Sequence, residues 1–518
     1  MKGRRSMMAR ASRATALVAV FSAGLIASAF AAEHPPLPKI GASLPQSAES
    51  YAFNSTAHQN VQQDLRALGY REDEYLIQGR ARVFDWAGAT ATPVVLAEGP
   101  YTTRVLIRRP LAARRFNGTV IVEPFNPSTN VDLPIMWAQS YEQLIADGYA
   151  WVGISIKPNT LHALKRFDPV RYAALAMPNP RSGVACSQQE INPLSQPTTV
   201  EDESGLAWDI LSQLGALLKS RDAARLIGRQ AERLYMTGQS QSAGYARTYA
   251  TAFAHTVSTV KGMPLYDGYL YAGSPPWHVP LNQCRKDLAE NDPRLITPAV
   301  GVPMLELFAQ GDIGTNIQTR RMDSDTAPDL FRRYELAGAS HVDTWEARSF
   351  PDAKDTARAQ GRAAGAADPE CTPTHVEPSD FPNRFLFNAA WRSLDAWVRK
   401  REPPPRAPPL ELKPAATVFD PADAFITDAH GNAKGGVRST YVDVPTVRWV
   451  GAKRGSFRCM FDGYKLPLES GVLMHLYPDH AAYVNQVRAR ADTLVAERWL
   501  TREDRDRVIE EAARASIP

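Results

Sequence analysis

The chain has 518 residues, which is enough to bury one large hydrophobic core or two smaller ones. Apolar residues make up 44% of it and charged residues 22%, the balance of an ordinary globular protein. The formal net charge is +4, and five of the basic residues lie within the first thirteen positions. Because the rest of the chain is near neutral, charge gives no argument for a nucleic acid or membrane partner, and neither is expected.

The first 31 residues have the pattern of an export signal. A basic start is followed by an apolar run over 14–29, which is too short to span a bilayer. Residues 29–31 read Ala-Phe-Ala, an A-x-A cleavage site, so we expect cleavage after Ala31. No second hydrophobic span follows. The sequence therefore predicts a signal peptide over 1–31 and an exported protein that is periplasmic or secreted. Both the general secretory pathway and the twin-arginine pathway are open as its export route.

The next part of the chain predicts strands before it predicts helices. Residues 33–50 are rich in Pro and Ser and predict no regular element, whereas the alternating pattern over 75–109 predicts antiparallel strands. From Gly118 onward, short apolar runs alternate with helical patterns. They predict strands over 119–123 and 150–156 and helices over 136–147 and 201–219. Residues 157–199 carry many Pro, Asn and Ser and show no long periodic pattern.

The most informative stretch follows the second of these helices. An apolar run from Leu234 leads into Gly-Gln-Ser-Gln-Ser at 238–242, and a small-residue helical segment comes next. A strand, a sharp turn and a helix with a serine at the apex form the pattern of a nucleophile elbow. Ser240 follows the strand and Gly238 directly, so we assign it as the nucleophile. Ser242, which has a Gly two residues after it but none two residues before, is the alternative.

Further strands alternate with helical or loop segments after the elbow. Strand candidates lie at 270–272, 303–308 and 331–336, and an amphipathic helix is predicted over 381–399. Strands that alternate with helices predict a mostly parallel sheet covered by helices on both faces. A Pro cluster at 403–409 marks a linker or a surface excursion, and helical patterns return near 478–515.

A serine nucleophile needs a base within hydrogen-bond reach and an acid that orients this base. Asp312 lies just past the strand at 303–308, and His341 lies on the loop after the strand at 331–336. Catalytic groups of open α/β sheets collect at such strand ends, and Ser, acid, His is the chain order of α/β-hydrolases. The sequence therefore predicts an α/β-hydrolase fold with a triad of Ser240, Asp312 and His341.

Other residues of the same types are weaker candidates for the triad. Glu306 lies inside its strand, and Asp323 and Asp325 lie on the following segment. Several other downstream histidines lack the setting of a strand followed by a loop; they include His255, His278, His375, His475 and His480.

The oxyanion that forms on attack needs preorganised N–H donors. One is expected from the residue after the nucleophile, Gln241. The second is expected from the loop after the strand at 119–123. Its candidates are Phe125, Asn126 and Ser128, of which we choose Asn126. An ordinary Asn-Pro turn is the alternative interpretation of this loop.

Four segments of the chain resemble a bacterial group of exported α/β-hydrolases known as the alpha/beta hydrolase domain family. They are the elbow at 238–242, the strand and turn at 120–126, the run Ala-Gly-Ala-Ser-His at 337–341, and the Gly-rich segment at 428–438. Gly-x-Ser-Gln-Ser is the ordinary elbow of that family. The resemblance therefore implies a serine hydrolase and carries over Ser240 as nucleophile and His341 as base.

The resemblance extends from about Tyr75 to the tail. It implies that residues 403–518 are an extension packed on the hydrolase domain rather than an independent module, with Asp428 and Arg438 as a structural pair. The run Pro-Phe-Asn-Pro at 124–127 departs from the Trp-bearing, Gly-rich stretch of the family.

Together these features predict a single hydrolase domain over 32–518 that cleaves a small-molecule carboxylic ester through an acyl-enzyme intermediate, without a cofactor or metal. The irregular segments at 157–199 and 273–300 are expected to form a cap over the site. An amidase or peptidase with the same triad and a non-catalytic binding protein on a hydrolase scaffold are the alternatives.

The cysteine count predicts two disulfides, because the number is even and the chain is expected to be exported. The four residues are Cys186, Cys284, Cys371 and Cys459. Their spacings are too wide for a zinc ribbon. Three pairings are open, and buried free cysteines are the alternative.

Overall fold

The computed structural model describes residues 34–88, 92–190, 199–257, 259, 261–361, 371–414, 420 and 423–517. The predicted signal peptide at 1–31 lies outside the described residues, as do residues 191–198 of the first predicted cap segment. Residues 32–518 form one compact unit. In the described ranges, no helix combines the length and the apolar character that a bilayer crossing requires.

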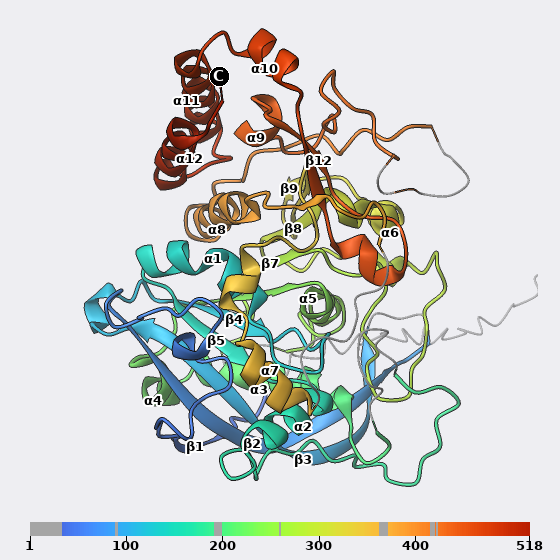
Figure 1. Ribbon diagram of the computed structural model, residues 1–518. Helices are drawn as coiled ribbons and strands as arrows, with labels where there is room; N and C mark the ends of the chain where they lie inside the picture. The colour runs from blue at the N-terminus through green and yellow to red at the C-terminus, as the bar shows by residue number, and fades with distance from the viewer. Residues whose placement is uncertain are drawn as a thin grey trace, which may run out of the picture. The chain divides into compact units, whose positions relative to one another are not determined.

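A ten-stranded sheet lies at the centre of the described chain (Figure 1), with the strand order β1-β2-β3-β5-β4-β6-β7-β8-β10-β9. Its strands are β1 Lys39–Ser43, β2 Tyr70–Trp86, β3 Pro93–Pro110, β4 Thr119–Pro124, β5 Ala150–Ile154, β6 Arg233–Gln239, β7 Gly268–Ala272, β8 Met304–Ala309, β9 Ser324–Thr326 and β10 Asp329–Leu336. The six central strands from β5 to β10 in this order run parallel. The outer strands pair antiparallel.

The helices that accompany this sheet come between its strands in the chain or after β10. They are α1 Ile135–Ala146, α2 Pro158–Phe167, α3 Ala207–Leu218, α4 Ala224–Ile227, α5 Gln241–Ala252, α6 Ile313–Asn316, α7 Ala353–Gln360 and α8 Asn383–Lys400. The C-terminal part adds α9 Thr440–Asp443, α10 Ser470–Leu476, α11 His480–Ala496 and α12 Arg502–Arg514, together with a small sheet of β11 Glu377–Pro378, β12 Val447–Val450 and β13 Tyr464–Pro467.

Helices cover both faces of the large sheet because its central strands are apolar on both sides. Along β4, Val120 and Val122 face one hydrophobic core, and Ile121 faces the other. Residues of α3 and α5 complete the first core, and residues of α1 and α8 complete the second (Figure 1). The predicted fold class and the predicted strands near 119, 150, 270, 303 and 331 are therefore confirmed.

Two predictions for irregular segments are wrong. Residues 33–50 contain β1, which pairs its backbone with β2 at the sheet edge. Residues 157–199 begin with α2, which buries Leu161, Leu164 and Phe167 and packs against α7. Both elements are short, and each depends on a partner distant in sequence, so neither leaves a long periodic pattern.

The C-terminal part is in contact with the hydrolase core at several points. The Ala337 amide donates to Val437 O, 3.1 Å away, and Phe385 of α8 packs with residues of α11 and α12 in a third cluster. Figure 1 shows α11 and α12 beside α8. The predicted structural pair also forms, since Arg438 Nη2 lies 2.8 Å from Asp428 Oδ2.

Two disulfides are present, as predicted, and the structure selects one of the three pairings. Cys186–Cys284 joins the two segments predicted to form the cap, which are also linked by a hydrogen bond from the Glu190 amide to the carbonyl of Gln283. Cys371–Cys459 joins the segment before α8 to a short 3-10 helix, η9, at Phe457–Phe461.

Candidate active site

The three residues of the predicted triad follow the ends of β6, β8 and β10. These strands run parallel, with β7 between β6 and β8. Parallel strands place their carboxyl ends at one edge of a sheet, which is where ligands of open α/β sheets bind. Ser240, Asp312 and His341 therefore lie at the same edge.

The elbow has the strained backbone that its pattern predicts. Ser240 has φ 57° and ψ −124°, an unusual conformation for a residue other than Gly, and α5 starts directly after it. Gly238 is required because a Cβ there would lie 2.5 Å from the Ser242 carbonyl carbon and oxygen. The missing side chain lets β6 and α5 approach closely enough to expose the serine at the turn.

The second serine of the motif has a structural role. Ser242 is fully buried, its hydroxyl accepts from the Gln239 amide at 3.0 Å, and it donates to the Gln239 carbonyl at 2.9 Å. Both backbone polar groups before the apex are thus satisfied by one side chain. A buried hydroxyl with these partners cannot reach a substrate, so the geometry favours Ser240 over Ser242 as nucleophile.

The predicted acid and base form a hydrogen-bonded pair. His341 Nδ1 lies 2.6 Å from Asp312 Oδ1, and both side chains are buried. The other carboxylate oxygen of Asp312 accepts from the Ala309 amide at 2.8 Å. Asp312 is therefore held by one fixed donor and presents its second oxygen to the ring, the arrangement that orients an imidazole.

Gly273 connects this pair to the elbow. The amide of Ser240 donates to the carbonyl of Ala272, the residue before Gly273, over 2.9 Å. A Cβ on Gly273 would lie 2.9 Å from His341 Nδ1 and 3.1 Å from Asp312 Oδ2. The imidazole thus lies against the end of β7, one residue from the carbonyl to which Ser240 is bonded. In the described residues, the Ser240 hydroxyl makes no hydrogen bond to the ring.

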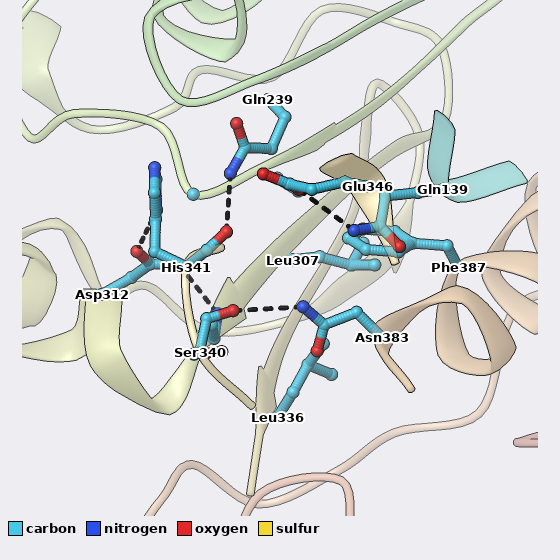
Figure 2. Close-up of a pocket in the computed structure, with 13 residues that line it drawn as sticks. Gln139, Gln239, Leu307, Asp312, Leu336, Ser340, His341, Glu346, Asn383 and Phe387 are labelled. Atoms are coloured by element: carbon cyan, nitrogen blue, oxygen red, sulfur yellow. Dashed lines mark hydrogen bonds and ion pairs between the residues drawn. The ribbon is translucent and has the colours of Figure 1, made fainter. Parts of the chain in front are cut away.

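Sequence reasoning misses two residues that contact the histidine. Gln239 Nε2 donates to the carbonyl of His341 at 2.9 Å (Figure 2). The Phe461 ring lies with its centre 4.6 Å from the imidazole centre, and the Val342 amide donates to the Phe461 carbonyl. Gln239 lies inside the elbow motif and was within reach of sequence reasoning, but no sequence signal links Phe461 to His341.

In the loop predicted to supply the second oxyanion donor, the three candidate amides are already hydrogen-bonded. The amides of Phe125, Asn126 and Ser128 donate to Ile154 O, Leu133 O and Asn126 Oδ1, all at 2.9 Å. A backbone donor at Asn126 is therefore not supported. The Asn126 side chain does reach the elbow, because its Nδ2 donates to the Gln239 carbonyl at 2.8 Å and carries a second N–H. Gln241, the other predicted donor, starts α5 and lies 3.3 Å from the Ser128 hydroxyl through its Oε1.

Three of the alternative acids and bases have hydrogen-bond or ion-pair partners of their own. Glu306 accepts from the Tyr271 hydroxyl at 2.7 Å within the sheet packing, and Asp325 pairs with Arg332 at 2.6 Å. His278 is buried between Thr248 and the Arg294 carbonyl, and this burial lowers its pKa to about 3.

The first predicted cap segment contains a buried ion pair near the end of β5. Lys157 follows β5, and its Nζ lies 2.7 Å from Glu190 Oε1 of the first segment. Glu190 also accepts from the Ser204 hydroxyl.

In the described ranges, no group of three or more His, Cys, Asp or Glu side chains is arranged to hold a metal ion.

Removing the Cys371–Cys459 disulfide is expected to loosen the segment that packs on His341. Because this bond closes a separation of 88 residues, replacing both cysteines with serine should lower the free energy of unfolding by about 2–4 kcal/mol. It should also lower kcat, since Phe461 follows Cys459 by two residues. Thermal unfolding and hydrolysis of a p-nitrophenyl ester, measured on the same samples, check both effects.

The matched control is the double serine variant of Cys186 and Cys284, which lies in the predicted cap. Its KM should change more than its kcat. If the Cys371/Cys459 variant lost stability while its kcat stayed at the wild-type value, the contact between Phe461 and His341 would have no part in activity.

Comparisons with known proteins agree with this description. A family model described as an alpha/beta hydrolase domain matches residues 34–510, most of the chain. No curated protein matches the sequence.

Among solved structures, similar folds include a thermostable esterase from Pseudomonas putida, with 11% identity, a TM-score of 0.29, and coverage of 58% of this chain and 84% of that one. A dienelactone hydrolase described as putative, from Klebsiella pneumoniae, has 14% identity, a TM-score of 0.27, and coverage of 55% and 95%. Acetyl xylan esterase 1 from Thermoanaerobacterium has 9% identity, a TM-score of 0.29, and coverage of 57% and 80%. These structural likenesses are distant, and the family assignment rests on the match over 34–510.

Proposed function

We propose that this chain, which belongs to the alpha/beta hydrolase domain family, is a serine hydrolase that cleaves a small-molecule carboxylic ester through an acyl-enzyme intermediate. The observation that carries the proposal is the buried hydrogen bond between Asp312 and His341. This pair lies at the end of β7, where the Ser240 amide is bonded to the Ala272 carbonyl. A strained serine beside an oriented imidazole is the arrangement that activates a hydroxyl for acyl transfer.

In the proposed mechanism, Ser240 Oγ attacks the ester carbonyl while His341 Nε2 takes the hydroxyl proton. Asp312 holds His341 Nδ1 protonated and stabilises the imidazolium. The alcohol leaves with the proton from His341, and a water molecule activated by the same ring then hydrolyses the acyl-Ser240 ester. Both steps pass through an oxyanion, for which the amide of Gln241 and the second side-chain N–H of Asn126 are the proposed donors.

The cellular location is part of the proposal. The structure contains two disulfides. Because disulfides form and persist in oxidising compartments, they support an exported protein. We propose a periplasmic or secreted enzyme whose signal peptide, residues 1–31, is removed after Ala31. The two segments joined by Cys186–Cys284 are the proposed cap that selects the substrate.

Labelling with a fluorophosphonate probe tests the function, because this probe reacts with an activated serine of any serine hydrolase. The wild type and the Ser242→Ala variant should be labelled, and Ser240→Ala should not, as read by intact mass. Labelling that persists in Ser240→Ala but disappears in Ser242→Ala would overturn the assignment. An unlabelled wild type would favour a non-catalytic binding protein.

An amidase or peptidase would give the same labelling, so a second measurement separates the classes. Turnover of a p-nitrophenyl ester should exceed that of the matching p-nitroanilide. The opposite order would identify an amidase with the same triad.

A further inference from the structure

The loop that carries His341 is held at both ends by side-chain amides from two helices. At its start, Asn383 Nδ2 of α8 donates to the Ser340 carbonyl at 3.1 Å. At its far end, Gln139 Nε2 of α1 donates to Asp343 Oδ2 and to Glu346 Oε2, each at 3.1 Å. Figure 2 shows the Asn383 amide directed at Ser340 and the Gln139 amide directed at Glu346.

A small cavity lies between these anchors. Its volume is about 10 Å³, which is room for about one water molecule. Its lining includes His341, Gln139, Asn383 and Glu346. The lining also includes Asp312 and Gly273, so the cavity lies against the Asp312–His341 pair.

The polar atoms at this cavity are hydrogen-bond acceptors that need donors. Gln139 Oε1 and Asn383 Oδ1 are buried without a partner in the described residues, and both side chains are only 3% exposed. The third polar group is the carboxyl of Glu346, which is 1% exposed. Buried acceptors without a donor are costly, so such a group of atoms points to a bound donor that the protein itself does not supply.

The two carboxyls on either side of Gln139 differ in how well they are satisfied. Asp343 Oδ1 accepts from the amides of Trp345 and Glu346 at 2.9 and 3.0 Å, and its Oδ2 accepts from Gln139. In the part of the chain that the structure describes, the Glu346 carboxyl accepts one hydrogen bond, from Gln139. Asp343 is therefore the better place for the negative charge, and Glu346 is the better place for a proton.

The charges around Glu346 also favour its protonated form. Burial raises the pKa of Glu346 well above its ordinary value, and the neighbouring Asp343 and Asp462 raise it further, whereas Arg458 opposes them. Burial also raises the pKa of Asp343, against its hydrogen bonds and the more distant Arg384. His341 is the remaining titratable group at the cavity, together with its partner Asp312.

We propose that protonated Glu346 and one buried water complete the hydrogen bonds behind the loop, and that Glu346 is thereby a positioning residue for His341. The water donates to Gln139 Oε1 and to Asn383 Oδ1, and it accepts from the Glu346 hydroxyl. With this water in place, the anchors at Ser340 and at Asp343 belong to one hydrogen-bond network. This network fixes the position of His341, which lies between them on the loop. This inference rests on the proposed catalytic role of His341.

Comparing Glu346→Gln with Glu346→Ala tests the network. The amide of a glutamine at this position donates to the water as the protonated carboxyl does, so Glu346→Gln should keep kcat within about threefold of wild type at pH 7. The alanine variant should lose kcat about 10- to 100-fold with little change in KM, since a displacement of about 1 Å costs up to about 10²-fold. Equal losses in both variants at pH 7 would overturn the proposal, because they would mean that an ionised Glu346 is required.

The pH dependence of unfolding gives a readout independent of catalysis. A carboxyl whose pKa is raised by folding adds stability that is full below its unfolded pKa, about 4.3 for Glu, and is lost as pH rises through the folded value. The urea midpoint of the wild type should therefore fall relative to that of Glu346→Gln as pH rises from 5 to 9. Other buried carboxyls are common to both proteins, so the difference between the two profiles reports Glu346. Parallel profiles would contradict the protonated state.

Asp504→Asn is a matched control for a purely structural effect. Asp504 is buried in α12, burial raises its pKa, and it accepts from the Asn388 side-chain amide at 2.9 Å, as Glu346 does from Gln139. It is not on the His341 loop, so its variant should change stability without lowering kcat. If Asp504→Asn lowered kcat as much as Glu346→Ala, the effect of the latter would be general destabilisation.

Failure of this inference is distinguishable from failure of the proposed function. A wild type that is not labelled at Ser240 removes the function. A labelled, active wild type whose kcat does not change in Glu346→Ala removes only the positioning role of Glu346.

Discussion

Replacing Ser240 with alanine is expected to lower kcat by about a millionfold, the loss seen when the nucleophile of a serine triad is removed. The second hydroxyl of the motif does not take its place, because Ser242 is buried and bonded at both its donor and its acceptor. Alanine keeps the Cβ and hence the backbone strain at φ 57°, so the variant should fold as the wild type does. Steady-state hydrolysis of a p-nitrophenyl ester, together with thermal unfolding, measures both.

Ser242→Ala is the natural counterpart of this variant. It leaves the buried Gln239 amide without its acceptor, which should cost about 1–3 kcal/mol of stability. The fluorophosphonate should still label it. A Ser240→Ala protein with more than a thousandth of wild-type activity, after contaminating hydrolase is excluded, would contradict the role of Ser240.

The second large effect is expected for Asp312→Asn, with a loss in kcat of about 10⁴-fold, as in other triads that lose their acid. Asp312 uses one oxygen for the Ala309 amide and the other for His341 Nδ1. An asparagine can present its oxygen to only one of these N–H groups. If it keeps Ala309, its NH₂ group faces Nδ1, and the imidazole adopts the tautomer that carries the proton on the nitrogen meant to accept from Ser240.

Asp323→Asn provides the comparison for this variant. Asp323 was an alternative acid in the sequence, but it accepts from the Arg333 amide at 3.1 Å on a neighbouring segment. Its variant should retain kcat within about threefold, in line with the small effects of substitutions away from the reacting atoms. Equal activity of Asp312→Asn and wild type would exclude the triad.

Much of the site was predictable because its signals are local. The apolar run before Gly238, the small residues of the elbow, and the order of Ser240, Asp312 and His341 are all readable without a structure. The strand ends are equally readable, since short apolar runs bounded by turns mark buried strands. These local features also predicted the fold class.

Other parts of the prediction did not hold because they depend on contacts between residues that are distant in sequence. The sequence offers the backbone amide of Asn126 as an oxyanion donor, but in the structure this amide donates to the Leu133 carbonyl. β1 was missed because an edge strand is held by backbone hydrogen bonds to β2, and backbone groups are the same in every residue. The contact between Phe461 and His341 joins residues that are 120 positions apart.

The sequence by itself determined the fold class and the order of the candidate catalytic residues, because helix and strand periodicity and glycine placement are properties of neighbouring residues. Only the tertiary structure decided which serine of the elbow is buried, which cysteines pair, and which amides hold the loop of the histidine. Gln139, Gln239 and Asn383 lie on three different elements and meet behind His341 only after these elements have packed. Hydrogen bonds between side chains and distant loops depend on positions accurate to a fraction of an ångström, and such positions result from packing the whole core rather than from any one segment.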